Sequence, residues 1–85
     1  MAEEKEIGKV THYFGKINVA VVELSDELKI GEKIHIVGGT RDFTQMVNSM
    51  QIEHQPIKEA KKGDVIGLKV DQPVREGDKD FKVIE

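Results

Sequence analysis

The sequence predicts an all-β protein, built as a small closed six-stranded antiparallel barrel of the Greek-key type. Two observations predict it. β-branched and aromatic residues gather in short windows at roughly ten-residue spacing, without a helical stripe. Glycines separate these windows, at Gly31, Gly38, Gly39, Gly63 and Gly77. A closed barrel protects its strand edges and needs few residues to enclose a core, so it suits a chain of 85 residues.

The windows place the strands in order along the chain. The expected strands are 7–14, 17–24, 33–37, 43–52, 64–70 and 79–84. Within 43–52 the apolar residues change parity, and a β-bulge near Asn48 and Ser49 would reconcile the two halves, because one extra residue reverses the face. Pro56 ends that strand, and 57–62 is expected to be a short connection with one helical turn.

The expected core takes one face of each strand. Its members are Val10, Val22, Leu24, Ile34, Ile36, Val47, Ile52, Ile66, Leu68 and Val83. Strand 17–24 is apolar on both faces, and its second set is Ile17, Val19 and Val21. Either a loop or chain end covers this second face, or the face is an apolar contact surface for a partner or a second copy of the chain.

Charge and composition exclude several classes of protein. The chain has 13 Lys and Arg against 16 Asp and Glu, a net charge of −3, and no cysteine, which rules out disulfides and thiol chemistry. Residues 1–6 read as a flexible acidic leader, followed by a single barrel domain over 7–85. No apolar run approaches the roughly 20 residues that span a bilayer, so we expect a cytoplasmic protein without membrane contact.

No catalytic or cofactor-binding arrangement is readable. The three histidines, His12, His35 and His54, fall on different expected strands and are expected to face outward, without metal-ligand spacing. Gly38-Gly39-Thr40 lacks the Lys-Ser/Thr of a phosphate-binding loop and leads into a strand, so it reads as a hairpin turn. Asp64 and Asp78 follow glycines, where a carboxylate can accept backbone N–H groups. We therefore expect a protein that is not an enzyme and holds no metal or cofactor.

Basic residues offer one further candidate contact. Lys58, Lys61 and Lys62 share one connection, and Arg75 could lie near them in the fold. Such a cluster suits RNA phosphates or an acidic protein face. The interleaved Glu59 favours the alternative, in which these lysines belong to a solvated loop.

The turn motifs occur in a distinctive order. They are Leu28-x-Ile30-Gly31-Glu32-x-Ile34, Val47-x-Ser49-x-Gln51-Ile52, Ala60-x-x-Gly63-Asp64-x-x-Gly67-Leu68 and Gly77-Asp78. With these motifs the chain resembles the β-barrel domain 2 of translational GTPases of the elongation factor Tu type. It is more closely similar to stand-alone translation elongation factor-like proteins. A comparable barrel is appended to the C-terminus of collagenase-like peptidases.

The resemblance implies a fold more strongly than a function. The factors' barrel contacts ribosomal and transfer RNA, but the corresponding strand here, residues 20–25, lacks the expected glycines and arginine. There is no nucleotide-binding motif, hence no GTP hydrolysis. The main hypothesis is a non-catalytic module that docks to the ribosome, RNA or a translation factor. The alternative is an interaction module that acts with a separate enzyme, such as a collagenase-like peptidase, or through homo-oligomerisation.

Overall fold

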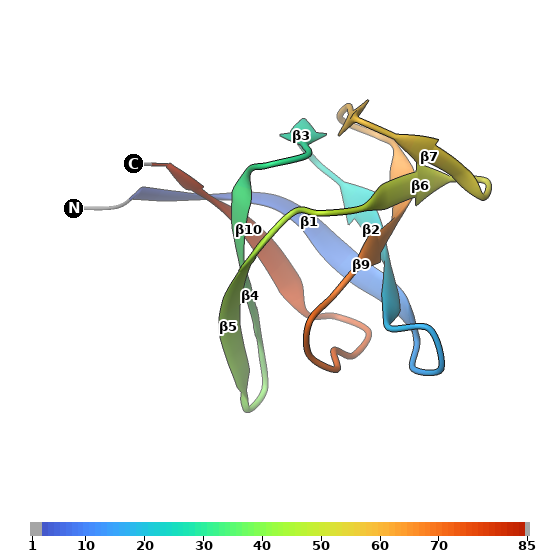
Figure 1. The fold of residues 1–85 in the computed structure, drawn as a ribbon. Coiled ribbons are helices and arrows are strands. Elements are labelled where there is room, and N and C mark those ends of the chain that lie inside the picture. The colour runs from blue at the N-terminus through green and yellow to red at the C-terminus, as the bar shows by residue number, and fades with distance from the viewer. Residues whose placement is uncertain (1–2, 85) are drawn as a thin grey trace.

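The computed structural model describes residues 3–84, and these contain ten β-strands and no helix (Figure 1). No helix in this part of the chain is therefore long and apolar enough to cross a membrane. The strands are β1 (Glu3–Phe14), β2 (Val19–Leu24), β3 (Leu28–Lys29), β4 (Lys33–Gly38), β5 (Arg41–Met46), β6 (Met50–Ile52), β7 (Gln55–Ile57), β8 (Glu59–Ala60), β9 (Val65–Lys69) and β10 (Lys79–Ile84). The prediction of an all-β fold is confirmed.

Eight of these strands form one antiparallel sheet in the order β5-β4-β10-β1-β2-β9-β6-β7, and β3 and β8 form a separate pair. The prediction of a closed six-stranded barrel is wrong, because β5 and β7 end the sheet and are not paired with each other. The side chain of Gln45 in β5 instead connects this strand to the end of β9 and to the loop that follows it. Its amide donates to the Lys69 carbonyl at 2.9 Å, and its oxygen accepts from the Asp71 N–H at 2.7 Å.

The opening originates where one long strand was predicted. The window 43–52 is divided between β5 and β6, and residues 47–49 belong to neither strand. Val47 donates its N–H to the Glu32 carbonyl, whereas the Ser49 carbonyl accepts from Lys69. The chain thus leaves β4 at Val47 and reaches β9 at Ser49. Instead of the predicted bulge, the strand ends at Met46, and residues 47–49 lead the chain from beside β4 to β6 beside β9.

The core lies inside the curved sheet and contains most of the predicted residues. Eight of the ten are buried, while Ile52 and Val83 are only half-buried. The core also includes residues that were not predicted, which are Ile7, Ala20, Leu28, Phe43, Met50, Ala60, Val70 and Val74. The segment 57–62 contains β8 and the end of β7, so the expected helical turn is wrong.

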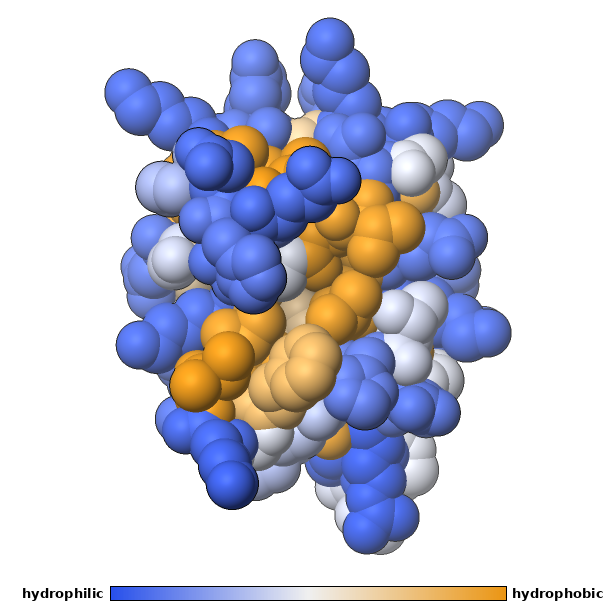
Figure 2. Space-filling model, turned by 90° about the vertical axis from the view of Figure 1, so that its right-hand side faces the viewer, coloured by the Kyte–Doolittle hydropathy of each residue, from blue (hydrophilic) through white to orange (hydrophobic). Residues whose placement is uncertain are grey.

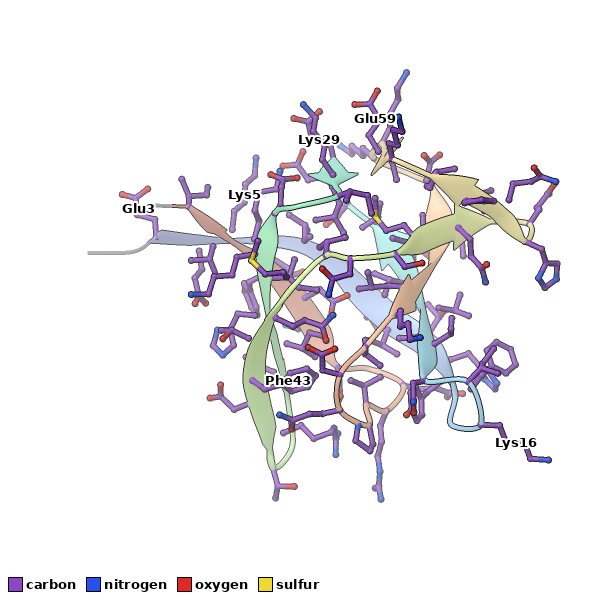
Figure 3. All side chains as sticks on the ribbon, in the orientation of Figure 1. Glu3, Lys5, Lys16, Lys29, Phe43 and Glu59 are labelled. Atoms are coloured by element: carbon purple, nitrogen blue, oxygen red, sulfur yellow. The ribbon has the colours of Figure 1, made fainter. Side chains whose placement is uncertain are left out.

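The N-terminal segment was expected to be a flexible leader, but residues 3–6 are part of β1. Glu3 pairs with Ile84 and Glu6 with Phe81, so backbone hydrogen bonding to β10 orders these charged residues although their side chains stay exposed. Figure 3 shows Glu3 and Lys5 on the end of this pair that projects from the body of the molecule. Lys5 Nζ lies 2.5 Å from Asp26 Oδ2. Residues 1 and 2 of the expected leader lie outside the described residues.

Candidate functional site

The outer face of β2 is the apolar surface that the sequence left undecided. Ala20, Val22 and Leu24 point into the core, so Val19 and Val21 must point outward, because side chains alternate along a strand. Ile17, in the turn before β2, is 58% exposed. The structure therefore brings the predicted set Ile17, Val19 and Val21 to one side of the molecule. No loop of the described chain buries Ile17.

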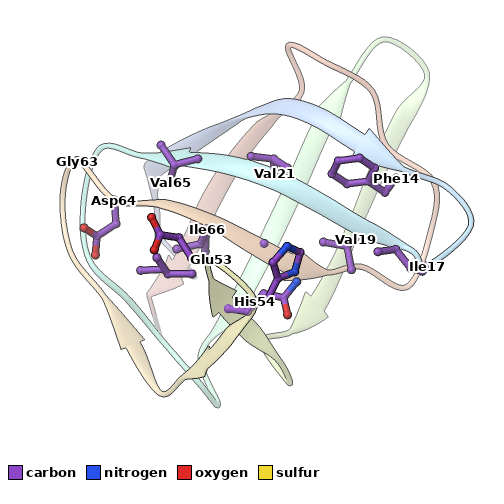
Figure 4. Close-up of a pocket in the computed structure, with 13 residues that line it drawn as sticks. Phe14, Ile17, Val19, Val21, Glu53, His54, Gly63, Asp64, Val65 and Ile66 are labelled. Carbon is purple, nitrogen blue, oxygen red and sulfur yellow. The ribbon is translucent and has the colours of Figure 1, made fainter.

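These residues line a groove of about 660 Å³. Its floor is the outer face of β2 and β9, and the tip of the β6–β7 hairpin forms one wall (Figure 4). The lining consists of Phe14, Ile17, Val19, Val21, Gln51, Ile52, Glu53, His54, Gly63, Asp64, Val65, Ile66 and Gly67. A groove of this size falls in the range of known ligand and peptide sites.

Several apolar side chains are exposed on this face of the molecule. Phe14 is 46% exposed and Val65 is 51% exposed. Figure 2 shows an apolar band across this side of the molecule, with hydrophilic residues around it. Single exposed apolar residues are ordinary, but a contiguous band with a polar rim is typical of an interaction surface.

Gly67 has no side chain and so leaves space in the middle of the groove floor. It pairs with Val21 on one side and Gln51 on the other. A Cβ atom at this position would lie 3.1 Å from Gln51 Cγ and 3.3 Å from Val19 Cγ1. A side chain here would therefore crowd its neighbours and fill the floor of the groove.

Two predicted turn carboxylates have the contacts expected of them. Asp64, at one end of the groove, accepts the Lys61 N–H at 2.9 Å through Oδ2. Asp78 accepts the Arg75 N–H at 3.0 Å and also a two-point contact from the Arg41 guanidinium, at 2.7 and 2.8 Å. The hydrogen bonds from Arg41 lower the pKa of Asp78, despite its burial. Arg41 was not foreseen, since its partner lies 37 positions away.

The predicted basic cluster is not assembled as one face. Lys58, Lys61 and Lys62 are exposed on the segment that contains β8. Arg75 lies in the loop between β9 and β10, which Figure 1 shows at the opposite end of the molecule. The expectation that Arg75 joins the lysines is wrong. They are separated because the lysines precede β9 and Arg75 follows it, so they lie at opposite ends of that strand.

The histidines were expected on different strands and facing outward; His12 lies on β1 and His35 on β4, whereas His54 lies in the turn between β6 and β7. The described residues contain no cluster suited to a metal ion. His12 and His54 are exposed. His35 is half-buried between two carboxylates, with Nδ1 2.8 Å from Glu4 Oε2 and Nε2 2.5 Å from Asp42 Oδ1. Hydrogen bonding to Asp42 and then to Glu4 raises the pKa of His35.

Comparison with known proteins relates the chain to peptidases. It is 43% identical over 81 residues to an uncharacterized protease of Methanocaldococcus jannaschii, and 37% identical over 78 residues to a collagenase of Porphyromonas gingivalis. These alignments cover 94% and 89% of this chain but only 20% and 22% of the relatives. The chain thus spans about a fifth of the length of the curated relatives it matches. No protein-family model matches it.

The same fold occurs in solved structures. Two crystal structures of the C-terminal domain of a Geobacillus thermoleovorans protein, described as a U32 peptidase, superpose with TM-scores of 0.85 and 0.86. They cover 89% and 92% of this chain, and the chain covers 96% and 91% of theirs. Sequence identity is 19% and 20%, so this likeness concerns the fold alone.

These relatives overturn the predicted identification as a translation elongation factor-like protein. The matching proteins are named as a protease, a collagenase and a U32 peptidase domain, not as translation factors. The turn glycines and core positions that carried the resemblance specify the fold, and proteins of different function share such folds. The expected role in translation is therefore wrong, and nothing in the relatives points to a ribosome or RNA partner. The comparisons favour the alternative, a module associated with a peptidase.

Proposed function

We propose that this chain is a non-catalytic docking module whose groove binds the catalytic part of a collagenase-type peptidase. One observation carries the proposal: an exposed apolar groove lies on a chain whose curated relatives are proteases about five times as long. In such proteins a module of this size has a larger neighbour to pack against. The groove is the surface of this chain best suited to that contact.

The chemistry of the groove suits binding rather than catalysis. Its titratable side chains are those of Glu53, His54 and Asp64, and the carboxylate of Asp64 is already engaged in a turn. Most of the remaining lining is apolar. Burying an exposed Ile, Phe or Val side chain contributes about 1.5–3 kcal/mol, so covering Ile17, Phe14 and Val65 together would supply several kcal/mol towards association.

A capture experiment with matched variants tests the proposal. The tagged chain is used to capture proteins from the source organism, a collagenase-type peptidase is identified by mass spectrometry, and its affinity is then measured with purified components. Ile17→Lys and Val65→Lys place a charge in the groove at exposed positions, so the fold should tolerate them. Met46→Lys is the control, because Met46 is also 46% exposed but lies on β5, outside the groove.

The expected result is capture of the peptidase by the wild type and by the Met46 variant, with at least tenfold weaker binding by both groove variants. Failure to capture such a peptidase, or equal binding by all variants, would contradict the proposal. Sedimentation velocity of the chain alone distinguishes self-association: a concentration-dependent dimer abolished by Ile17→Lys would mean that the groove binds a second copy instead.

A further inference from the structure

The two ends of the groove differ in chemistry. Figure 4 shows Phe14, Ile17 and Val19 at one end, and Glu53 and Asp64 at the other, with His54 between them. The first end presents apolar side chains only. The second end presents two carboxylates on different elements, since Glu53 is at the tip of the β6–β7 hairpin and Asp64 precedes β9. An occupant of the whole groove must therefore satisfy both an apolar and an acidic surface.

Among the described residues, no lysine or arginine side chain pairs with the acidic end. No Lys or Arg lines the groove, and neither Glu53 nor Asp64 forms a salt bridge among residues 3–84. The hydrogen bond from Lys61 N–H orients the Asp64 carboxylate but supplies no charge. A partner that excluded water from this end without supplying a positive charge would leave two carboxylates desolvated and unpaired. That desolvation would oppose binding.

The backbone at Glu53 is held in an unfavourable conformation. Glu53 and His54 have φ values of 50° and 65°, in the left-handed region that favours glycine and asparagine. They form the two-residue turn between Ile52 and Gln55, where Asn-Gly would be the unstrained choice. The chain has instead two ionisable side chains here, and both line the groove. Strain of this kind is commonly kept at binding sites, where the side chain serves a purpose other than folding.

We infer that the groove binds an apolar peptide segment that carries a lysine or arginine side chain. The apolar residues of the segment pack on Phe14, Ile17 and Val19, and its cation lies between Glu53 and Asp64. This inference rests on the proposed docking function and names the chemistry of the docked segment. Arginine suits the site best, because a guanidinium presents several donors and can hydrogen-bond both carboxylates at once.

Three short peptides test this inference without the peptidase. Each is the acetylated, amidated pentapeptide Leu-Val-X-Leu-Val, in which X is Arg, Gln or Glu, and binding to the full chain is followed by NMR. The Arg peptide is expected to shift the amide signals of Val19, Val21, His54 and Gly67, and to bind at least fivefold more tightly than the Glu peptide. Equal affinity for the three peptides, shifts elsewhere on the chain, or no binding would overturn the inference.

A charge-only substitution locates the cation. Glu53→Gln keeps the size and backbone strain of the turn, and should reduce the preference for Arg over Glu to about twofold or less. Glu59→Gln makes the same change at an exposed position on β8 outside the groove, and should leave the preference intact. An undiminished preference in the Glu53 variant would refute the assignment of the acidic end.

The two proposals can fail separately. If the peptidase binds the wild type and Ile17→Lys abolishes that binding while Glu53→Gln has no effect on it, docking stands and the cationic segment is wrong. If the Arg peptide binds selectively but no peptidase is captured, the groove chemistry stands and the proposed partner is wrong.

Discussion

Asp80 is a buried carboxylate without a hydrogen-bond partner, and its substitution gives the sharpest test of the fold energetics. It lies on β10, paired with Gly8 of β1 and Ile36 of β4, and is 1% exposed. Neither of its carboxylate oxygens has a hydrogen-bond partner within the described chain. Burial, with a further contribution from the negative charge of Asp78, raises the pKa of Asp80 to about 7.

The consequence for stability follows from the difference in pKa between the folded and unfolded chain. The ordinary value is 3.8, and each pH unit of difference corresponds to about 1.36 kcal/mol, so charging Asp80 costs the fold about 4 kcal/mol. Because the folded pKa is the higher one, this cost is absent below about pH 4. It grows as the pH rises from the unfolded to the folded pKa, and is constant above about pH 7.

Asp80→Asn removes the charge and keeps the shape of the side chain. We expect the variant to match the wild type at pH 3.5 and to be more stable by about 4 kcal/mol at pH 8, since the amide does not ionise. Urea unfolding at pH 3.5, 5, 6.5 and 8 gives the free energy of unfolding at each pH. Asp71→Asn is the control, because Asp71 is exposed. Its difference in free energy of unfolding from the wild type should not grow as the pH rises.

The reasoning would be refuted by a stability difference that stays constant across this range, or by a variant less stable than the wild type at pH 8. NMR titration of the Asp80 carboxyl carbon provides a direct check. A midpoint near 4 would show that water or a local rearrangement solvates the carboxylate.

Three further variants address other contacts. The pKa of His35 is raised by its two carboxylate partners, so His35→Gln should cost about 1 kcal/mol of unfolding free energy at pH 5.5 and almost nothing at pH 9; equal costs at both pH values would contradict this. Arg41→Met leaves buried Asp78 without its cation and should destabilise the chain by about 3 kcal/mol at pH 7 in urea unfolding, with a smaller cost once acid protonates the carboxylate. Replacing Glu53-His54 by Asn-Gly removes the backbone strain of the left-handed turn. The free energy of unfolding should rise by about 1–2 kcal/mol, and the melting temperature should rise with it. A lower melting temperature would show that the turn is not strained.

Local pattern was sufficient to locate most of the strands and much of the core. Windows of β-branched and aromatic residues bounded by glycines placed β1, β2, β4, β9 and β10 within a few residues of their observed bounds, because such residues favour the extended backbone of a strand. The glycine-aspartate turns were also readable, since a carboxylate that accepts nearby N–H groups is a local arrangement. Each of these features depends on residues close together in the chain.

The burial of β10 shows where local pattern fails. Its apolar residues are Phe81, Val83 and Ile84, and Val83 was predicted in the core. The structure instead turns Asp78 and Asp80 inward and leaves Phe81 and Val83 half-buried. Arg41 forms an ion pair with Asp78, 37 positions away in the sequence. The strand register that brings them together buries Asp78 and Asp80, and the positions of the apolar residues in β10 do not predict that register.

The sequence by itself determined that this protein is all-β, that it lacks cysteine chemistry, and that strand 17–24 is apolar on both faces. Only the tertiary structure decided that the sheet stays open and that Ile17, Val19 and Val21 form the outer face. It also joined that face to Val65 and to the hairpin carrying Glu53, which makes the groove. The physical reason is that strand pairing over long sequence separations sets which faces meet, and alternation within one strand gives two faces without saying which of them is buried.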